Sequence, residues 1–276
     1  MNDSSSTVEA LAAFGFQARK VLLELIKWLE RVENPTGDEE RGFVYTWHLT
    51  LTTIAWDVSE AAINLGSSGS VRAARMLNRS LSEYAFRAHR YGRSPQSALR
   101  DGSKASAMAR KVMLPTKTIR GGMSDSQYAA FKAYLEAGPT QVTFEKLRKT
   151  MCATVEAFTV SGQAFDKFLQ WFEVEYTLGS GLIHGSIVAI LDVFRKGTGT
   201  RVERGERSLH FKREDELART ITCLIVLIAA VEFYHDADFG GRQLVKALDE
   251  QFFGEKRFVS VWQHNALLPL IGVRRS

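Results

Sequence analysis

The sequence predicts a mainly α protein: a single-domain helical bundle with a small β-hairpin-like excursion near residues 188–212. Apolar residues recur at helical spacing along most of the chain, and glycine and proline breakers separate the runs. No internal repeat or linker marks a second domain. The 276 residues, 45% of them hydrophobic, are enough for one packed core. We therefore assign residues 1–276 to one helical domain.

The first three helices follow from the spacing of apolar residues. A flexible tail of residues 1–6 precedes a helix over Val8–Leu29, which a breaker at residues 33–40 ends. A second helix is expected over about Arg41–Leu65 and a third over about Ser70–Tyr91. Because a short Gly-Ser connection joins the second and third helices, we expect them to be antiparallel.

The remainder of the chain alternates irregular and helical segments. Residues 93–126 contain prolines and glycines and predict an irregular basic segment. A long amphipathic helix is expected over about Thr143–Leu178, before the β-hairpin-like excursion. After the excursion, helical patterns return at Glu214–His235 and again at residues 241–253.

Composition indicates a cytoplasmic protein. The start of the chain lacks the basic residues and apolar run of a signal peptide. The longest apolar run, Ile221–Val231, is shorter than the roughly 20 residues that span a membrane, so we interpret it as a core helix and expect no membrane partner. Cys152 and Cys223 have no metal-type spacing, and no GxxxxGK[ST] or GxGxxG motif is present. We expect no cofactor and no metal.

Positive charge is concentrated in one block. Residues 72–120 contain twelve lysines and arginines against two acidic residues, a net charge of +10, whereas the whole chain carries +5. Such a block suits RNA or another polyanion, because phosphate contacts and counterion release drive this binding. The alternative is a solvated basic surface, or one that pairs with acidic segments of the same chain.

Two rows of polar residues stand at helical spacing. Arg79, Glu83 and Arg87 follow one another at four-residue intervals in the third predicted helix, flanked by apolar residues. We expect Arg79 and Glu83 to be paired and at least partly buried. The row is either a structural ion-pair ladder or part of a site.

The second row lies in the stretch YTLGSGLIHGS. Tyr176, Ser180 and His184 would share one helical face, and we expect His184 to face the arginine row, because the two rows have complementary donors and acceptors. The structural alternative is a core histidine whose ring nitrogens bond Ser180 or Glu83.

The chain resembles a prokaryotic helical family of unknown function in three features. They are RSLSEYAFR on one helix, Y-x-x-x-S-x-x-x-H-G-S on a later one, and a glycine-rich loop followed by the CLIVLIAAV helix. Some members of that family are associated with phage defence. The layout also looks like the HEPN group, helical bundles that include metal-independent ribonucleases with an Arg, a polar residue and a His four to six residues after the Arg. This chain departs from that pattern, since no arginine precedes His184 at that interval. Elsewhere, His210 follows Arg204 by six residues, which fits, and His48 follows Arg41 by seven, one more than the pattern allows.

The resemblance implies a protein that binds or cleaves RNA, with His184 as base or acid. Arg79, paired with Glu83, and Arg87 would clamp the phosphate, while Tyr176 and Ser180 would orient the imidazole or the substrate. A non-catalytic module that binds an anionic ligand or assembles as a homo-oligomer is the alternative.

A weaker alternative is a metal protein of the ferritin-like carboxylate type. Glu232 and His235 form one Glu-x-x-His half-motif, and Asp57 and Glu60 could add carboxylates. The half-motif has no second copy in the sequence.

Overall fold

A bundle of long helices forms the part of the chain that the structure describes. The computed structural model describes residues 3–32, 39–96, 98, 124–129, 194–196, 202–204, 212–248 and 250–251. Helices dominate these residues, which confirms the predicted mainly α fold class.

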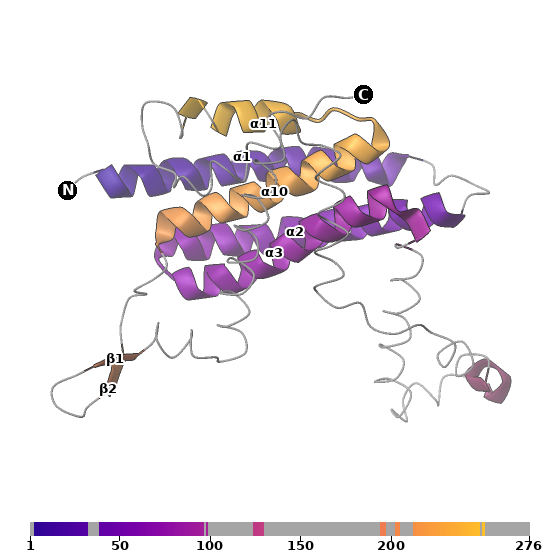
Figure 1. Cartoon of the computed structure of the whole chain (residues 1–276), viewed down its shortest axis with the longest axis horizontal. Helices are drawn as coiled ribbons and strands as arrows, with labels where there is room; N and C mark the ends of the chain where they lie inside the picture. The colour runs from indigo at the N-terminus through magenta and orange to yellow at the C-terminus, as the bar shows by residue number, and fades with distance from the viewer. Residues whose placement is uncertain are drawn as a thin grey trace.

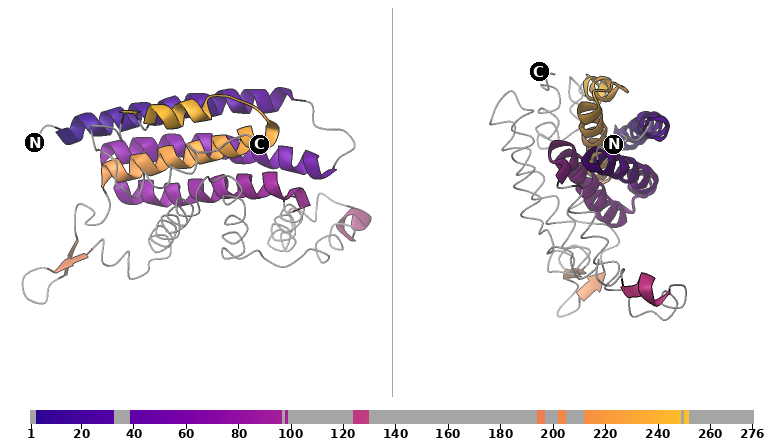
Figure 2. Two further views of the ribbon diagram at one scale, coloured as in Figure 1. Left: turned by 45° about the horizontal axis from the view of Figure 1, so that its top comes forward. Right: turned by 90° about the vertical axis from the view of Figure 1, so that its right-hand side faces the viewer.

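Four long helices make the bundle and a fifth, shorter one covers it (Figure 1). They are α1 (Asp3–Arg31), α2 (Glu39–Ser68), α3 (Val71–Arg93), α10 (Arg213–His235) and α11 (Gly241–Leu248). Helix α10 contacts α1, α2 and α3, and α11 packs against α10 and α1. Figure 2 shows α10 lying between α1 and α3, so α10 is the central helix of the core.

Helices α2 and α3 are antiparallel, as the short connection predicted. Near the start of α2, His48 Nε2 lies 2.9 Å from the carbonyl oxygen of Ala88, near the end of α3. The rings of Trp47 and Tyr91 are 5.1 Å apart at the same end. Both contacts require the two helices to run in opposite directions.

Helices α3 and α10 run in the same direction. Asn78 of α3 bonds Glu216 near the start of α10, whereas a Cβ added at Gly92, near the end of α3, would contact Tyr234 near the end of α10. Parallel neighbours need a long crossover connection. Helix α3 therefore ends at one end of the bundle, and α10 begins at the other.

The apolar run of α10 is buried as predicted. Leu224, Ile225 and Ile228 have no exposed surface, and most of the helix packs inside the bundle. By length and composition α10 would also pass as a membrane-spanning helix, but most of its apolar window is covered by protein. Burial on all sides explains why the sequence of α10 is apolar around its whole circumference.

Two boundaries differ from the predictions. Helix α1 begins at Asp3, inside the predicted tail of residues 1–6, because Asp and Ser are residue types that favour the start of a helix. Helix α2 extends to Ser68, past the glycine at 66, and a break with positive φ follows at Gly69. Glycine adopts that backbone conformation without the penalty of a Cβ.

The described strands are short. Strands β1 (Phe194–Lys196) and β2 (Val202–Arg204) pair antiparallel, with Phe194 opposite Arg204. They fall within residues 188–212, but the rest of that segment lies outside the described residues, so the excursion as a whole stays a prediction. The predicted helix over 143–178 and most of the basic segment 93–126 also lie outside them.

The corner between α10 and α11 is fixed by one buried carboxylate. Glu232 Oε1 accepts the backbone N–H groups of Phe239, at 2.6 Å, and Gly241, at 3.0 Å. The intervening turn places Asp236 in the left-handed region, with φ of 49°. Glu232 therefore holds the chain where it reverses direction.

We expect Gly241→Ala to destabilise the protein by about 1 to 3 kcal/mol. A Cβ at this position would lie against Glu232 Oε2, so the carboxylate would have to move and give up its two backbone hydrogen bonds. Urea unfolding measures the loss. Gly66→Ala is the control, because the nearest contact of its Cβ would be the flexible side chain of Leu217, at 3.2 Å, and no carboxylate would have to move. Equal stability of Gly241→Ala and wild type would show that the carboxylate does not fix this corner.

Candidate functional site

The predicted ion pair on α3 is present. Arg79 Nη2 lies 2.9 Å from Glu83 Oε1, and the two side chains are 18% and 23% exposed. The pairing and partial burial expected from the sequence are therefore confirmed. Arg87, one turn further along α3, is also partly buried.

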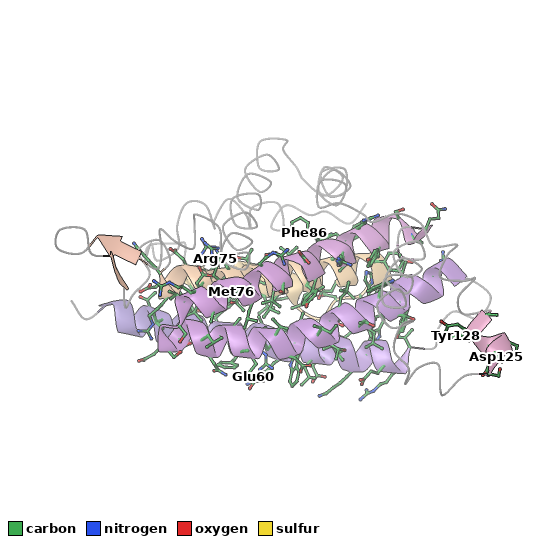
Figure 3. The ribbon with its side chains drawn as sticks, turned by 90° about the horizontal axis from the view of Figure 1, so that it is seen from below. Glu60, Arg75, Met76, Phe86, Asp125 and Tyr128 are labelled. Carbon is green, nitrogen blue, oxygen red and sulfur yellow. The ribbon has the colours of Figure 1, made fainter. Side chains whose placement is uncertain are left out.

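Helix α3 carries an excess of arginine. It contains six arginines, and Glu83 is its single acidic residue. Arg75 and Arg90 are buried (Figure 3 labels Arg75), whereas Arg72, Arg79 and Arg87 keep partial exposure. At 3.6 residues per turn, these last three lie on one side of the helix. We call Arg72, Arg79 and Arg87 the arginine face of α3; Met76, whose side chain is exposed, lies on the same side.

A buried polar network that the sequence analysis missed lies beneath α3. It is centred on Glu216 of α10, and we call it the Glu216 network: Arg75, Asn78, Glu216, Arg219 and Thr220. Glu216 Oε1 is 3.3 Å from Arg75 Nε and accepts a hydrogen bond from Arg219 Nη1. Glu216 Oε2 accepts from Asn78 Nδ2 at 3.0 Å, and the Thr220 hydroxyl donates to Asn78 Oδ1 at 2.7 Å.

The Glu216 network places two guanidinium groups around one carboxylate. The Arg75 side chain is 2% exposed and that of Glu216 is fully buried. Burial and the neighbouring charge of Arg219 lower the pKa of Arg75 to about 9, against the opposing attraction of Glu216. Arg75 therefore stays charged at neutral pH, and the network positions the inner side of α3 through charged hydrogen bonds.

A weak signal for this network exists in the sequence. Arg75, Asn78 and Ser82 stand three and then four residues apart on α3, and Glu216 and Thr220 stand four apart at the start of an otherwise apolar helix. Polar residues that stand at helical spacing among apolar ones become buried, and buried polar groups need hydrogen-bond partners. Which two helices meet could not be read from that spacing.

Cys223 lies at the edge of the same interface. Its sulfur is 3.3 Å from the hydroxyl oxygen of Ser82, and the side chain is buried. Burial raises the pKa of the Cys223 thiol to about 11. Because the thiolate is the nucleophilic form, this thiol is inert at neutral pH.

A second polar cluster, at the opposite end of α10, contains two histidines. His48 Nε2 is 2.9 Å from the carbonyl oxygen of Ala88, and His48 Nδ1 is 3.0 Å from His235 Nε2. The rings of Trp28 and Tyr45 pack edge-on against His235, with centroids 5.7 and 5.6 Å away. The sequence analysis did not anticipate this pair.

The position of His48 excludes the interval from Arg41 to His48 as a HEPN active site. Arg41 and His48 come within one residue of the spacing of a HEPN active site, but His48 is fully buried among the helices, whereas Arg41 is exposed. A base that removes a proton from RNA must reach its substrate. In this structure His48 bonds Ala88 and His235 instead, so it belongs to the core.

The second predicted row cannot be placed. Tyr176, Ser180 and His184 lie outside the described residues, as does His210. That His184 faces Arg79, Glu83 and Arg87 therefore stays a prediction.

The metal alternative gains no support from the described residues. Glu232 accepts hydrogen bonds from the backbone N–H groups of Phe239 and Gly241, and His235 bonds His48. Glu60 pairs with Arg19 at 2.8 Å on the outer side of α1 and α2. Among the residues placed in the structure, no group of three or more His, Cys, Asp or Glu side chains could hold a metal ion.

Comparison with models of known protein families, with curated proteins and with solved structures found no match to this chain. The likeness to the HEPN group therefore rests on the sequence motifs alone. The function is inferred below from the arginine face of α3 and the residues that support it.

Proposed function

We propose that the protein is a HEPN-like helical protein that binds RNA, and that the arginine face of α3 holds the phosphate backbone. The observation that carries this proposal is the partly exposed pair of Arg79 and Glu83, with further arginines on the same side of the helix. Guanidinium groups form paired hydrogen bonds with phosphate, and a row of them follows a polyanion.

The Glu216 network supports this binding from beneath. It holds Asn78 on the inner side of α3 with two hydrogen bonds to Glu216 of α10, and Arg75 with an ion pair to the same carboxylate. A helix fixed in this way presents its outer arginines in a defined geometry, which lowers the entropy lost on binding. The network therefore acts as a scaffold and the arginine face as the contact surface.

RNA cleavage without a metal ion is the proposed reaction. His184 takes the proton of a ribose 2′-hydroxyl, whose oxygen then attacks the adjacent phosphorus; the 5′-oxygen leaves and takes up a proton. Arg79 and Arg87 stabilise the negative charge that gathers on the phosphate, and Glu83 holds Arg79 in place. Tyr176 and Ser180 orient the imidazole. The resemblance adds a proposed role as a cytoplasmic phage-defence effector.

The competing proposal is a non-catalytic module, which binds an anionic ligand or assembles as a homo-oligomer. The full burial of Glu216 favours it, since a buried network of this kind can serve the fold alone. Cleavage and ligand binding are separated by one substitution, His184→Ala. Loss of RNA cleavage with unchanged RNA affinity supports the ribonuclease, whereas absence of cleavage by wild type and variant alike favours the module.

We expect Arg87→Ala to weaken binding of a fluorescently labelled single-stranded RNA by about ten- to a hundredfold, because one charged hydrogen bond to phosphate contributes about 1.5 to 3 kcal/mol. Fluorescence anisotropy at fixed salt, with chelator present, measures this affinity. The control is Lys20→Ala, which removes an exposed cation from α1. If the two variants bind RNA equally well, the arginine face is not the contact surface.

A further inference from the structure

One acidic side chain lies within the arginine face of α3. Glu83 is the single acidic residue of this helix, and it stands one turn after Arg79 and one turn before Arg87. The row therefore runs Arg, Glu, Arg over about 12 Å of the helix axis. A carboxylate in the middle of this row repels the phosphates that its two neighbours attract. It lowers the affinity of the row for a nucleic acid unless it contacts another group of the ligand.

The Glu83 carboxylate is held in place and has one open oxygen. Its Oε1 lies 2.9 Å from Arg79 Nη2, and the side chain is 23% exposed. The acidic partners of two other ion pairs, Glu24 and Glu60, are 62% and 52% exposed. The second oxygen of Glu83, Oε2, accepts no hydrogen bond from the part of the chain that the structure describes. Glu83 thus offers a positioned acceptor between two arginines.

The backbone of RNA has one group that suits such an acceptor. The phosphate and ring oxygens of a nucleic-acid backbone carry no hydrogen and can only accept, whereas the ribose 2′-hydroxyl can also donate. A hydrogen bond from a hydroxyl to a carboxylate is charge-assisted and short. The N–H groups of the bases are the other donors of a nucleic acid, but they lie away from the phosphates that the arginines hold.

We propose that Glu83 accepts a hydrogen bond from a ribose 2′-hydroxyl of the bound strand and so makes the arginine face selective for RNA over DNA. The inference rests on the proposed binding of RNA by this face and adds its sugar specificity. A strand that follows the row meets Arg79, Glu83 and Arg87 in turn, so phosphate contacts flank the ribose contact on both sides. Arginines alone would hold RNA and DNA alike, because both present the same phosphates.

The competing role for Glu83 is that of a partner to Arg79 alone. In that role the carboxylate orients a guanidinium that contacts phosphate, and its loss weakens the binding of RNA and DNA by the same factor. The ratio of the two affinities separates the roles, because the phosphate contacts cancel in it. Recognition of the 2′-hydroxyl is a property of binding and does not require cleavage.

Three labelled single-stranded oligomers of one sequence test the proposal: RNA, 2′-fluoro RNA, and DNA with uracil in place of thymine. The 2′-fluoro oligomer has no 2′ hydrogen-bond donor but keeps the sugar pucker of RNA, so it separates the hydrogen bond from the shape of the backbone. Fluorescence anisotropy at fixed salt, with chelator present, measures the affinities. Wild type should bind RNA about tenfold more tightly than either of the others, as one hydrogen bond to a charged group predicts.

Four variants assign the preference to one side chain. Glu83→Ala should bind the three oligomers equally, and Glu83→Gln, which keeps a neutral acceptor, should retain only a few-fold preference. Glu60→Ala is the matched control, because it also removes a carboxylate paired with an arginine, on the outer side of α1 and α2, and it should keep the full preference. Arg87→Ala should weaken the binding of all three oligomers by one factor. If wild type cuts the RNA, every protein also carries His184→Ala.

Equal affinity of wild type for the three oligomers, or a preference that persists in Glu83→Ala, overturns the proposal. Uniform weakening by Glu83→Ala with the preference intact would leave Glu83 as a partner of Arg79 only. Both results leave RNA binding by the arginine face standing, since Arg87→Ala tests that binding. If wild type binds none of the oligomers, the proposed function fails and this inference with it. If Glu83→Ala does not fold, Glu83→Gln and the wild-type preference decide.

Discussion

Lowering the pH from 7 to 5 should remove about 4 kcal/mol of the free energy of unfolding through two buried histidines, roughly 2 kcal/mol from each. His48 and His89 are both buried in the bundle. Burial lowers the pKa of His48 to about 3 and that of His89 to about 4, while the backbone of Val226, which bonds His89, opposes the second shift.

The sign of the effect follows from these lowered values. Above pH 6.5 the histidines are neutral in both the folded and the unfolded chain, so their contribution to stability is fully present. As the pH falls below 6.5, the unfolded chain takes up protons that the folded chain refuses. Stability is lost down to the folded pKa values, and it stops falling once His48 and His89 are protonated in both states.

Urea unfolding followed by circular dichroism at pH 7 and pH 5 measures this change. His89→Gln should remove about half of the loss, because glutamine does not titrate and keeps an N–H group near Val226. His48→Gln should remove a similar share. A free energy of unfolding that is equal at the two pH values would mean that the histidines are solvated in the folded protein.

Glu216→Ala should destabilise the protein by about 3 to 5 kcal/mol, the usual effect of stranding a buried charge. The carboxylate is the shared partner of Arg75 and Arg219, and it also accepts from Asn78. Without it, two guanidinium groups face each other in a buried site. The substitution should also loosen α3 and reduce RNA affinity indirectly.

The control for Glu216→Ala is Glu24→Ala. Glu24 pairs with Lys27 at 2.8 Å on the surface of α1, where the two side chains are 62% and 44% exposed. Exposed pairs of this kind contribute at most about 1 kcal/mol. In thermal unfolding, Glu216→Ala should therefore have a clearly lower melting temperature than Glu24→Ala. Equal melting temperatures would show that the Glu216 network does not stabilise the protein.

The helices could be predicted because local signals fix them. The breaker after α1, Gly69 after α2 and the apolar run of α10 each act over a few residues, and the predicted bounds of α2, α3 and α10 agree with the structure to within a turn, whereas α1 begins five residues before its predicted start. The pairing of Arg79 with Glu83 is also local, since four residues bring side chains together on any helix.

The two buried clusters could not be predicted, because their members are distant in sequence. Asn78 and Glu216 are 138 residues apart, and His48 and His235 are 187 apart. Spacing within each helix shows that a polar residue needs a partner but not which helix supplies it. The parallel arrangement of α3 and α10 decides this, and it depends on a crossover whose length leaves several topologies open.

The salt dependence of RNA affinity tests the central claim, that the arginine face of α3 binds the phosphate backbone. Affinity for one labelled single-stranded RNA is measured over a range of salt concentrations in wild type, Arg79→Ala, Arg87→Ala and Lys20→Ala. For single strands, each phosphate contact adds about 0.7 to the slope of log affinity against log salt. We predict that both arginine variants lose about that much slope and that Lys20→Ala keeps the wild-type value. Identical slopes in all four proteins, or no RNA binding by wild type, would contradict the claim.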